Sequence, residues 1–155
     1  MALSGYCHGM ANSVSVENDV NVSSDVAFAY LSDYTKIADW LYGLSELKAL
    51  TEQTRGVGAK FDGTIKLGAK LQSLIEVIEF EEGRLMVLDS YKGIKNTSHW
   101  LVTPVGDSTC RIKVTWDYDL GGGIAGKALG KVVEPVVKIA AGASTKSLKE
   151  KLEAL

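Results

Sequence analysis

The side chains of this chain that are able to do proton chemistry lie on strand-like stretches rather than in a motif of fixed spacing. In a regular strand over residues 71–80, Glu76 shares a face with Leu74, Ile78 and Phe80. A carboxylate on an apolar face needs a partner or takes a raised pKa, so Glu76 is a candidate polar anchor or general acid/base. A one-residue bulge would instead turn Glu76 to solvent, and this alternative stays open.

Tyr118 is the second candidate, in the strand predicted over 109–120. Alternation along that strand places six side chains on one face: Cys110, Ile112, Val114, Trp116, Tyr118 and Leu120. Aromatic side chains with one polar atom suit a ligand pocket, because they supply apolar surface and a single hydrogen-bonding group. Ordinary core packing is the alternative interpretation of Trp116 and Tyr118.

Other kinds of catalytic site find little support. His8 and His99 are the only histidines, and neither stands in a Ser-His-Asp or Cys-His arrangement. The two cysteines, Cys7 and Cys110, are too far apart for a zinc motif, so we expect no metal site and no cofactor. His99 is adjacent to Trp100 and therefore points to the opposite face of its strand, as a structural residue or as a ligand contact.

A glycine cluster at residues 121–123 begins a near match to a phosphate-binding loop. The stretch GGGIAGKA has the spacing of G-x-x-x-x-G-K, but Ala128 stands where a hydroxyl is needed for magnesium. We therefore expect the glycines to form the turn between a strand and a helix.

Composition points to one soluble domain. The chain has 155 residues, 46% hydrophobic and 23% charged, with a net charge of -2. This charge excludes a global basic field for nucleic acid, and no apolar run is long enough to span a bilayer. The start has no secretory signal, so we expect a cytoplasmic protein with a flexible leader at 1–12 and a single domain at 13–155. The oligomeric state stays open.

The order of predicted elements is one strand, two short helices, six strands and one long helix. Val14, Val16 and Val20 alternate with polar residues, and the two helices after them divide near Ser32-Asp33. The six later strands are predicted over residues 44–55, 59–67, 71–80, 84–91, 94–103 and 109–120. Their short connections indicate antiparallel neighbours, so the class is α+β.

The closing helix carries an apolar stripe that includes Val133 and Val137, and it should lie against the sheet. Pro135 predicts a bend or a break within it. Gly126, Gly130 and Gly142 lower helix stability, which indicates either close packing or room for a ligand. We therefore expect a hollow between the sheet and this helix that holds a hydrophobic small molecule.

Two stretches resemble the START/Bet v 1-like (SRPBCC) superfamily, and in particular its polyketide cyclase/dehydrase and lipid-transport branch. The first runs from Val22 to Trp40, with Asp33 at the helix break. The second runs from Trp116 through the glycines to Lys127 and is followed by Glu134-Pro135. The resemblance implies a helix-grip fold. In this fold a curved antiparallel sheet of about seven strands wraps round a long C-terminal helix and leaves an internal cavity between them. Two short helices follow the first strand.

In that fold the two short helices help to form the cavity mouth, so the resemblance makes Tyr34, Trp40 and Tyr42 gate candidates. Together with the inward-facing positions of the strands and the closing helix, the predicted ligand-binding set is Tyr34, Trp40, Phe61, Ile65, Glu76, Tyr91, Trp100, Trp116, Tyr118, Val133 and Val137. The expected function is binding, with transport as one form of it, of a lipid, isoprenoid or polyketide.

Two alternatives remain open at this point. One is an aromatase/cyclase-type enzyme, in which Glu76 and Tyr118 move protons within one pocket. The other is an accessory interaction module that uses the lysines of the closing helix, which carries six lysines against three acidic residues from Lys127 onward.

Overall fold

The computed structural model describes residues 12–66, 70–93, 95–119 and 123–155, and the side chains of 123–133 are not included in that description. The leader predicted at 1–12 falls outside it except for Asn12, the first residue of β1. Seven strands form one antiparallel sheet in the order β1-β7-β6-β5-β4-β3-β2. Their bounds are β1 Asn12–Val20, β2 Leu44–Ala49, β3 Lys60–Lys66, β4 Lys70–Glu81, β5 Leu85–Gly93, β6 Asn96–Gly106 and β7 Thr109–Tyr118.

The two short helices carry the chain from one edge of the sheet to the other. α1 spans Ser24–Leu31 and α2 spans Tyr34–Trp40. The Ser23 hydroxyl caps α1 by accepting from the N–H of Val26, and Asp33 caps α2 by accepting from the N–H of Thr35. The predicted division at Ser32-Asp33 is therefore confirmed, and it has a physical cause: Asp33 begins a new helix instead of extending the first.

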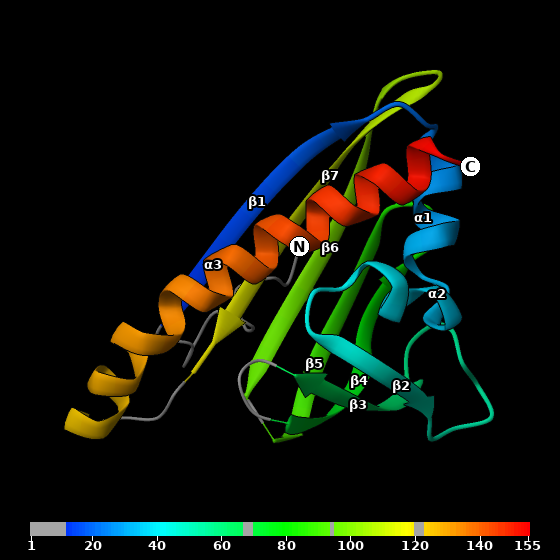
Figure 1. The fold of residues 1–155 in the computed structure, drawn as a ribbon. Coiled ribbons are helices and arrows are strands. Elements are labelled where there is room, and N and C mark those ends of the chain that lie inside the picture. Colours follow the sequence, from blue (N-terminus) through cyan, green and yellow to red (C-terminus); the bar gives the residue numbers. More distant parts are fainter. Residues whose placement is uncertain (1–11, 67–69, 94, 120–122) are drawn as a thin grey trace.

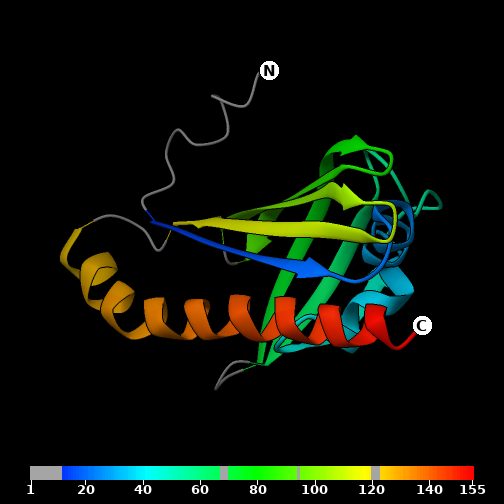
Figure 2. The same cartoon turned by 90° about the horizontal axis from the view of Figure 1, so that it is seen from above.

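The closing helix α3 spans Gly123–Glu153 and continues without interruption through Pro135, so the break that the proline predicted does not occur. Proline removes only one donor N–H, and the neighbouring turns of a long helix keep their own hydrogen bonds. α3 runs alongside β1 over the concave face of the sheet (Figures 1 and 2). Within the described residues its backbone packs against β1, β7, α1 and α2, and not against β2–β6.

The main core lies between the sheet, α1, α2 and the last turns of α3. It contains Phe28, Leu31, Trp100, Val102, Ile112, Val114, Leu148 and Leu152, all nearly or fully buried. The alternation predicted for the last strand is confirmed, because Cys110, Ile112 and Val114 are buried while Arg111 and Lys113 are exposed. Burying apolar side chains of this size stabilises the fold by about 1.5–3 kcal/mol each.

One predicted strand is much shorter than expected. The strand predicted over 44–55 ends at Ala49, and a loop follows until β3 begins at Lys60. Gly56 and Gly58 take positive φ values of 87° and 97° in this loop. Glycine adopts such angles without the steric cost that a Cβ imposes, so these two positions turn the chain out of the sheet.

Candidate functional site

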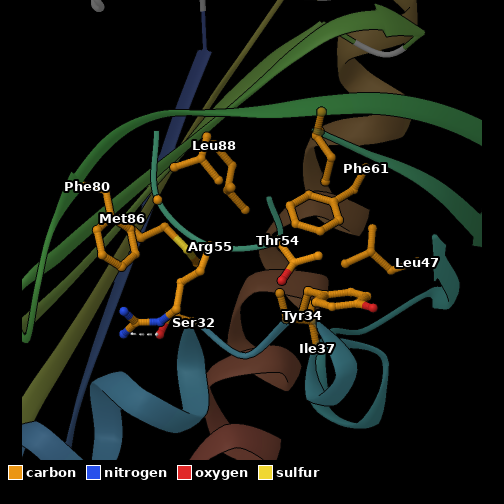
Figure 3. A pocket seen from close by; sticks show the side chains of 13 residues that line it. Ser32, Tyr34, Ile37, Leu47, Thr54, Arg55, Phe61, Phe80, Met86 and Leu88 are labelled. Atoms are coloured by element: carbon orange, nitrogen blue, oxygen red, sulfur yellow. Dashed lines mark hydrogen bonds between the residues drawn. The ribbon is translucent and has the colours of Figure 1, made fainter. Parts of the chain in front are cut away.

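A small cavity lies under α2, on the concave side of β3, β4 and β5 (Figure 3). Its apolar lining comes from several elements that are distant in sequence: Ile37, Leu47, Phe61, Ile75, Val77, Phe80, Met86 and Leu88. Ser32, Tyr34, Thr54, Arg55 and Gly56 complete it. The gaps between the lining atoms total about 310 Å³, part of it open to solvent, but only about 10 Å³ admits the centre of a water molecule. That is room for about one water.

Two of the predicted ligand-binding residues meet at this cavity. The Tyr34 ring of α2 lies 5.3 Å from the Phe61 ring of β3, with an angle of 31° between the ring planes. Phe61 is buried, whereas Tyr34 is half-buried and belongs to the helix that covers the cavity. This contact fits the prediction that Tyr34 stands at the mouth.

Arg55 is the one charged side chain among the lining residues, and it holds the loop before β3 against α1. Its guanidinium lies 4.9 Å from the centre of the Phe80 ring and 5.9 Å from that of Phe28. It donates a hydrogen bond of 3.1 Å to the Ser32 hydroxyl and pairs with Glu82 at 2.6 Å. Cation–π contacts of this kind each contribute about 0.5–1 kcal/mol at exposed sites.

A wider groove lies directly outside the cavity. Its volume is about 260 Å³, and its lining is Ala29, Ser32, Asp33, Tyr34, Thr54 and Arg55. Four of these residues, namely Ser32, Tyr34, Thr54 and Arg55, also line the inner cavity. The side chains shared by the two hollows therefore form the partition between them.

The space predicted between the last strand and the closing helix is filled where the structure describes it. Val14, Tyr118 and Ala141 form a buried cluster, and Trp116 and Val137 pack against it. The expectation of a hollow at Trp116 and Tyr118 is therefore wrong. The physical reason is the position of α3, which lies close above β1 and β7.

Tyr118 is only 4% exposed, and its hydroxyl has no hydrogen-bond partner among the described residues. Burial raises the pKa of Tyr118 above the ordinary value of 10.0, and the negative charge of Glu134 adds to this effect. A tyrosine whose anion is disfavoured is a poor general base, so the environment of Tyr118 favours a packing role.

Glu76 does not point into the cavity. A register shift between Val77 and Glu79 inserts an extra residue into β4. In the strand register Glu76 lies opposite Lys60 of β3 and Asp89 of β5. The bulge alternative is therefore confirmed, and the placement of Glu76 on the face of Phe80 is wrong. A bulge reverses the alternation of a strand beyond it.

Tyr91 also lies on the outer face of the sheet. It is 47% exposed and the Lys60 ammonium lies 5.4 Å from the centre of its ring. Met86 and Leu88 line the cavity, so alternation along β5 turns Tyr91 to the outer face. Its predicted inward placement is therefore wrong.

The remaining predicted residues are divided between the core and the partly covered inner face. Trp40 and Trp100 meet edge to face at 5.1 Å, and the Trp100 indole donates to the Ser98 hydroxyl at 3.1 Å. Both are buried core residues. Ile65 points inward and is half-buried. Val133 lies outside the residues whose side chains are described.

His99 lies on the outer face, where its Nε2 is 3.4 Å from a carboxylate oxygen of Asp117. Asp117 is buried although the alternation of its strand points it away from the helix. This pair is separated from the cavity by the thickness of the sheet, which agrees with the structural interpretation of His99.

Within the described ranges, no three His, Cys, Asp or Glu side chains gather in a way that would hold a metal ion. In the same part of the chain, no helix combines the length and apolar character needed to cross a membrane.

Comparison with known families extends over almost the whole chain. Residues 11–153 match the family described as polyketide cyclase/dehydrase and lipid transport. The chain belongs to this family. No curated protein matches the sequence.

Several solved structures superpose closely on the chain. The protein TTHA0849 from Thermus thermophilus is 20% identical, with a TM-score of 0.79 over 92% of this chain and 98% of its own. The Zhui aromatase/cyclase from Streptomyces sp. R1128 is 14% identical, with a TM-score of 0.79 over 92% and 93%. A START superfamily protein from Mycobacterium smegmatis is 18% identical, with a TM-score of 0.69 over 92% and 94%. The START/Bet v 1-like helix-grip fold predicted from the sequence is thereby confirmed.

Sequence reasoning missed the residues of the loop before β3, above all Thr54 and Arg55. The strand predicted over 44–55 includes both residues, whereas β2 ends at Ala49. The pair Gly56 and Gly58 indicates the turn between the strands predicted over 44–55 and 59–67, but the loop already begins after Ala49.

Proposed function

We propose that this protein binds a hydrophobic small molecule on the concave side of its sheet, under α2. The observation that carries the proposal is that apolar side chains on the inner face stay incompletely covered. Ile65, Ile75 and Leu88 point inward from β3, β4 and β5, yet each is only half-buried. The backbone of α3 packs over β1 and β7, and the cavity beside β3, β4 and β5 is covered by residues of α2 and of the loop before β3.

The small cavity volume sets a condition on this function. Small-molecule sites usually enclose about 300–1,000 Å³, and the cavity here holds about one water. A ligand must therefore displace lining side chains as it enters. Tyr34 and Arg55 are the side chains to move, because both are partly exposed and both separate the cavity from the groove.

The test is uptake of a neutral apolar fluorophore, N-phenylnaphthylamine, combined with native mass spectrometry and solvent extraction of freshly purified protein. Leu88→Phe should lower the affinity for the fluorophore several-fold, since Leu88 lines the cavity. Leu101→Phe is the matched control, because Leu101 is half-buried on the outer face of the adjacent strand. Absence of uptake by the unmodified protein, or equal loss in both variants, would refute the proposal.

The enzyme alternative draws support from the aromatase/cyclase among the similar structures. It required Glu76 and Tyr118 to converge in one pocket, but Glu76 lies opposite Lys60 of β3 on the outer face, whereas Tyr118 packs against Ala141 on the inner side. Binding without chemistry is therefore the better-supported function.

The interaction-module alternative rested on the lysines of α3. Lys138 pairs with Glu134 at 3.5 Å, and the Lys149 ammonium donates to the backbone oxygen of Asp19 at 3.0 Å. Two of these lysines are thus engaged within the chain, which weakens the case for a charged docking face.

A further inference from the structure

The cavity and the groove form one amphipathic site, and the positively charged side chain of Arg55 lies between the two hollows. Six of the cavity's side chains are apolar and come from β3, β4 and β5: Phe61, Ile75, Val77, Phe80, Met86 and Leu88. Arg55 is the only charged residue of the cavity lining and one of two charged residues lining the groove. The other, Asp33, is already used, since its carboxylate caps α2 through Thr35.

The loop that carries Arg55 is held in place by specific hydrogen bonds. The Gln53 side-chain amide donates to the backbone oxygens of Arg55 and Val57, at 2.8 and 2.9 Å. Gly58 donates its N–H to the backbone oxygen of Val77 in β4 at 2.9 Å. The Gln53 bonds brace the loop internally and the Gly58 bond joins it to β4, so the Arg55 side chain projects from a fixed backbone across the mouth.

The contacts of the Arg55 guanidinium leave capacity for a further anion. Its Nη2 makes both the hydrogen bond to Ser32 and the ion pair with Glu82. An arginine presents five N–H donors in a planar fork, which suits a carboxylate that accepts two of them. Glu82 is a weak competitor, because its side chain is 68% exposed and solvent screens exposed ion pairs.

We propose that Arg55 binds the carboxylate of an amphipathic ligand whose apolar tail enters the cavity under α2. This inference rests on the proposed function and narrows it to apolar acids. The carboxylate replaces Glu82 as the partner of Arg55, and the guanidinium swings from the Phe80 ring towards the groove. That movement removes the partition between groove and cavity and gives the tail its path.

The test compares decanoate with decanol, which differ only in the charged end, by displacement of N-phenylnaphthylamine from the purified protein. The unmodified protein should bind decanoate about tenfold more tightly than decanol, which corresponds to about 1.4 kcal/mol. Arg55→Gln should abolish this preference by weakening decanoate binding alone. Arg84→Gln is the matched control, because Arg84 is an exposed arginine paired with Glu81 and lines neither hollow.

Glu82→Gln is a second variant that acts in the opposite direction. Removal of the competing carboxylate should strengthen decanoate binding and leave decanol binding unchanged. Equal affinities for decanoate and decanol, or a preference that survives Arg55→Gln, would overturn the role of Arg55 while the proposed function stands. Failure of both compounds to bind the unmodified protein would overturn the proposed function and this inference with it.

Discussion

The backbone N–H of Tyr42 donates a hydrogen bond of 2.9 Å to the hydroxyl of Ser144, a residue that is fully buried in α3. The two residues are 102 positions apart in sequence. This bond joins the turn after α2 to the middle of the long helix. It therefore connects the element that covers the cavity with the element that closes the β1 edge of the sheet.

Replacement of Ser144 by alanine should lower the free energy of unfolding by about 1–2 kcal/mol, because the Tyr42 N–H loses its acceptor. Chemical denaturation followed by circular dichroism measures this. Ser147→Ala is the control, since Ser147 is half-buried one turn further along the helix and should stay within about 0.5 kcal/mol of the parent. Equal changes in the free energy of unfolding at the two serines would show that the hydrogen bond between Tyr42 and Ser144 does not stabilise the fold.

Gly142→Ala should raise the free energy of unfolding by roughly 0.5–1 kcal/mol. A Cβ built at Gly142 meets no atom within 4 Å, so alanine gains helix propensity without a clash. This open space also rules out close packing as the reason for that glycine.

Gly93→Ala provides the contrast to Gly142→Ala. Gly93 has a φ of 95°, and a Cβ added there would collide with the backbone oxygen of Gln72. Alanine there should lower the free energy of unfolding by more than about 1 kcal/mol. Thermal denaturation of both variants distinguishes the two sites, and a loss of stability in Gly142→Ala would contradict the open space seen beside it.

The Asp19–Arg111 pair should make stability depend on acid pH. Arg111 donates to both carboxylate oxygens of Asp19, at 2.7 and 3.1 Å, and this hydrogen bonding lowers the pKa of Asp19 below its ordinary value of 3.8. A carboxyl group with a lowered folded-state pKa stabilises the fold above its unfolded pKa and loses that contribution as the pH falls through the folded value.

Asp19→Asn should therefore reduce the loss of stability on acidification below about pH 4. Urea denaturation at neutral and acid pH gives the comparison. Asp107→Asn, at an exposed position in the β6–β7 turn, is the control and should leave the acid dependence unchanged. An acid dependence that is identical in the parent and in Asp19→Asn would refute the prediction.

Tyr118→Phe should alter stability at alkaline pH. Because burial raises the pKa of Tyr118, the unfolded chain gives up this proton at a lower pH than the folded protein does. The parent therefore loses stability as the pH rises from the unfolded to the folded pKa, and phenylalanine removes that part of the loss. At neutral pH the variant should equal the parent or exceed it by up to about 1 kcal/mol, since a buried hydroxyl without a described partner is removed.

Denaturation at neutral pH and above about pH 10 measures this effect of Tyr118. Tyr42→Phe is the control, because Tyr42 is 47% exposed and should not change the alkaline slope. The loss of stability at alkaline pH that remains in Tyr118→Phe includes a contribution from Tyr30, because burial also raises the pKa of Tyr30. If the free energy of unfolding falls with alkaline pH equally in the parent and in Tyr118→Phe, the Tyr118 hydroxyl is hydrated in the folded protein.

Much of the architecture could be predicted from local patterns. Alternation of apolar and polar residues predicts strands, and the capping residues Ser23 and Asp33 mark where α1 and α2 begin. These signals work because they act between residues a few positions apart. Of the residues predicted to contact a ligand, Tyr34 and Phe61 line the cavity under α2.

Tertiary structure decided which way Glu76 points, because a bulge costs little locally and depends on the partner strands. It also decided which face of β5 looks inward, and Tyr91 lies on the other face. It also decided where the space lies. Sequence periodicity identifies the apolar face of α3, but not whether that face rests over β1 and β7 or over the middle of the sheet. Arg55 reaches the cavity only because the loop before β3 folds back against α1, a contact between segments that have no pattern in common.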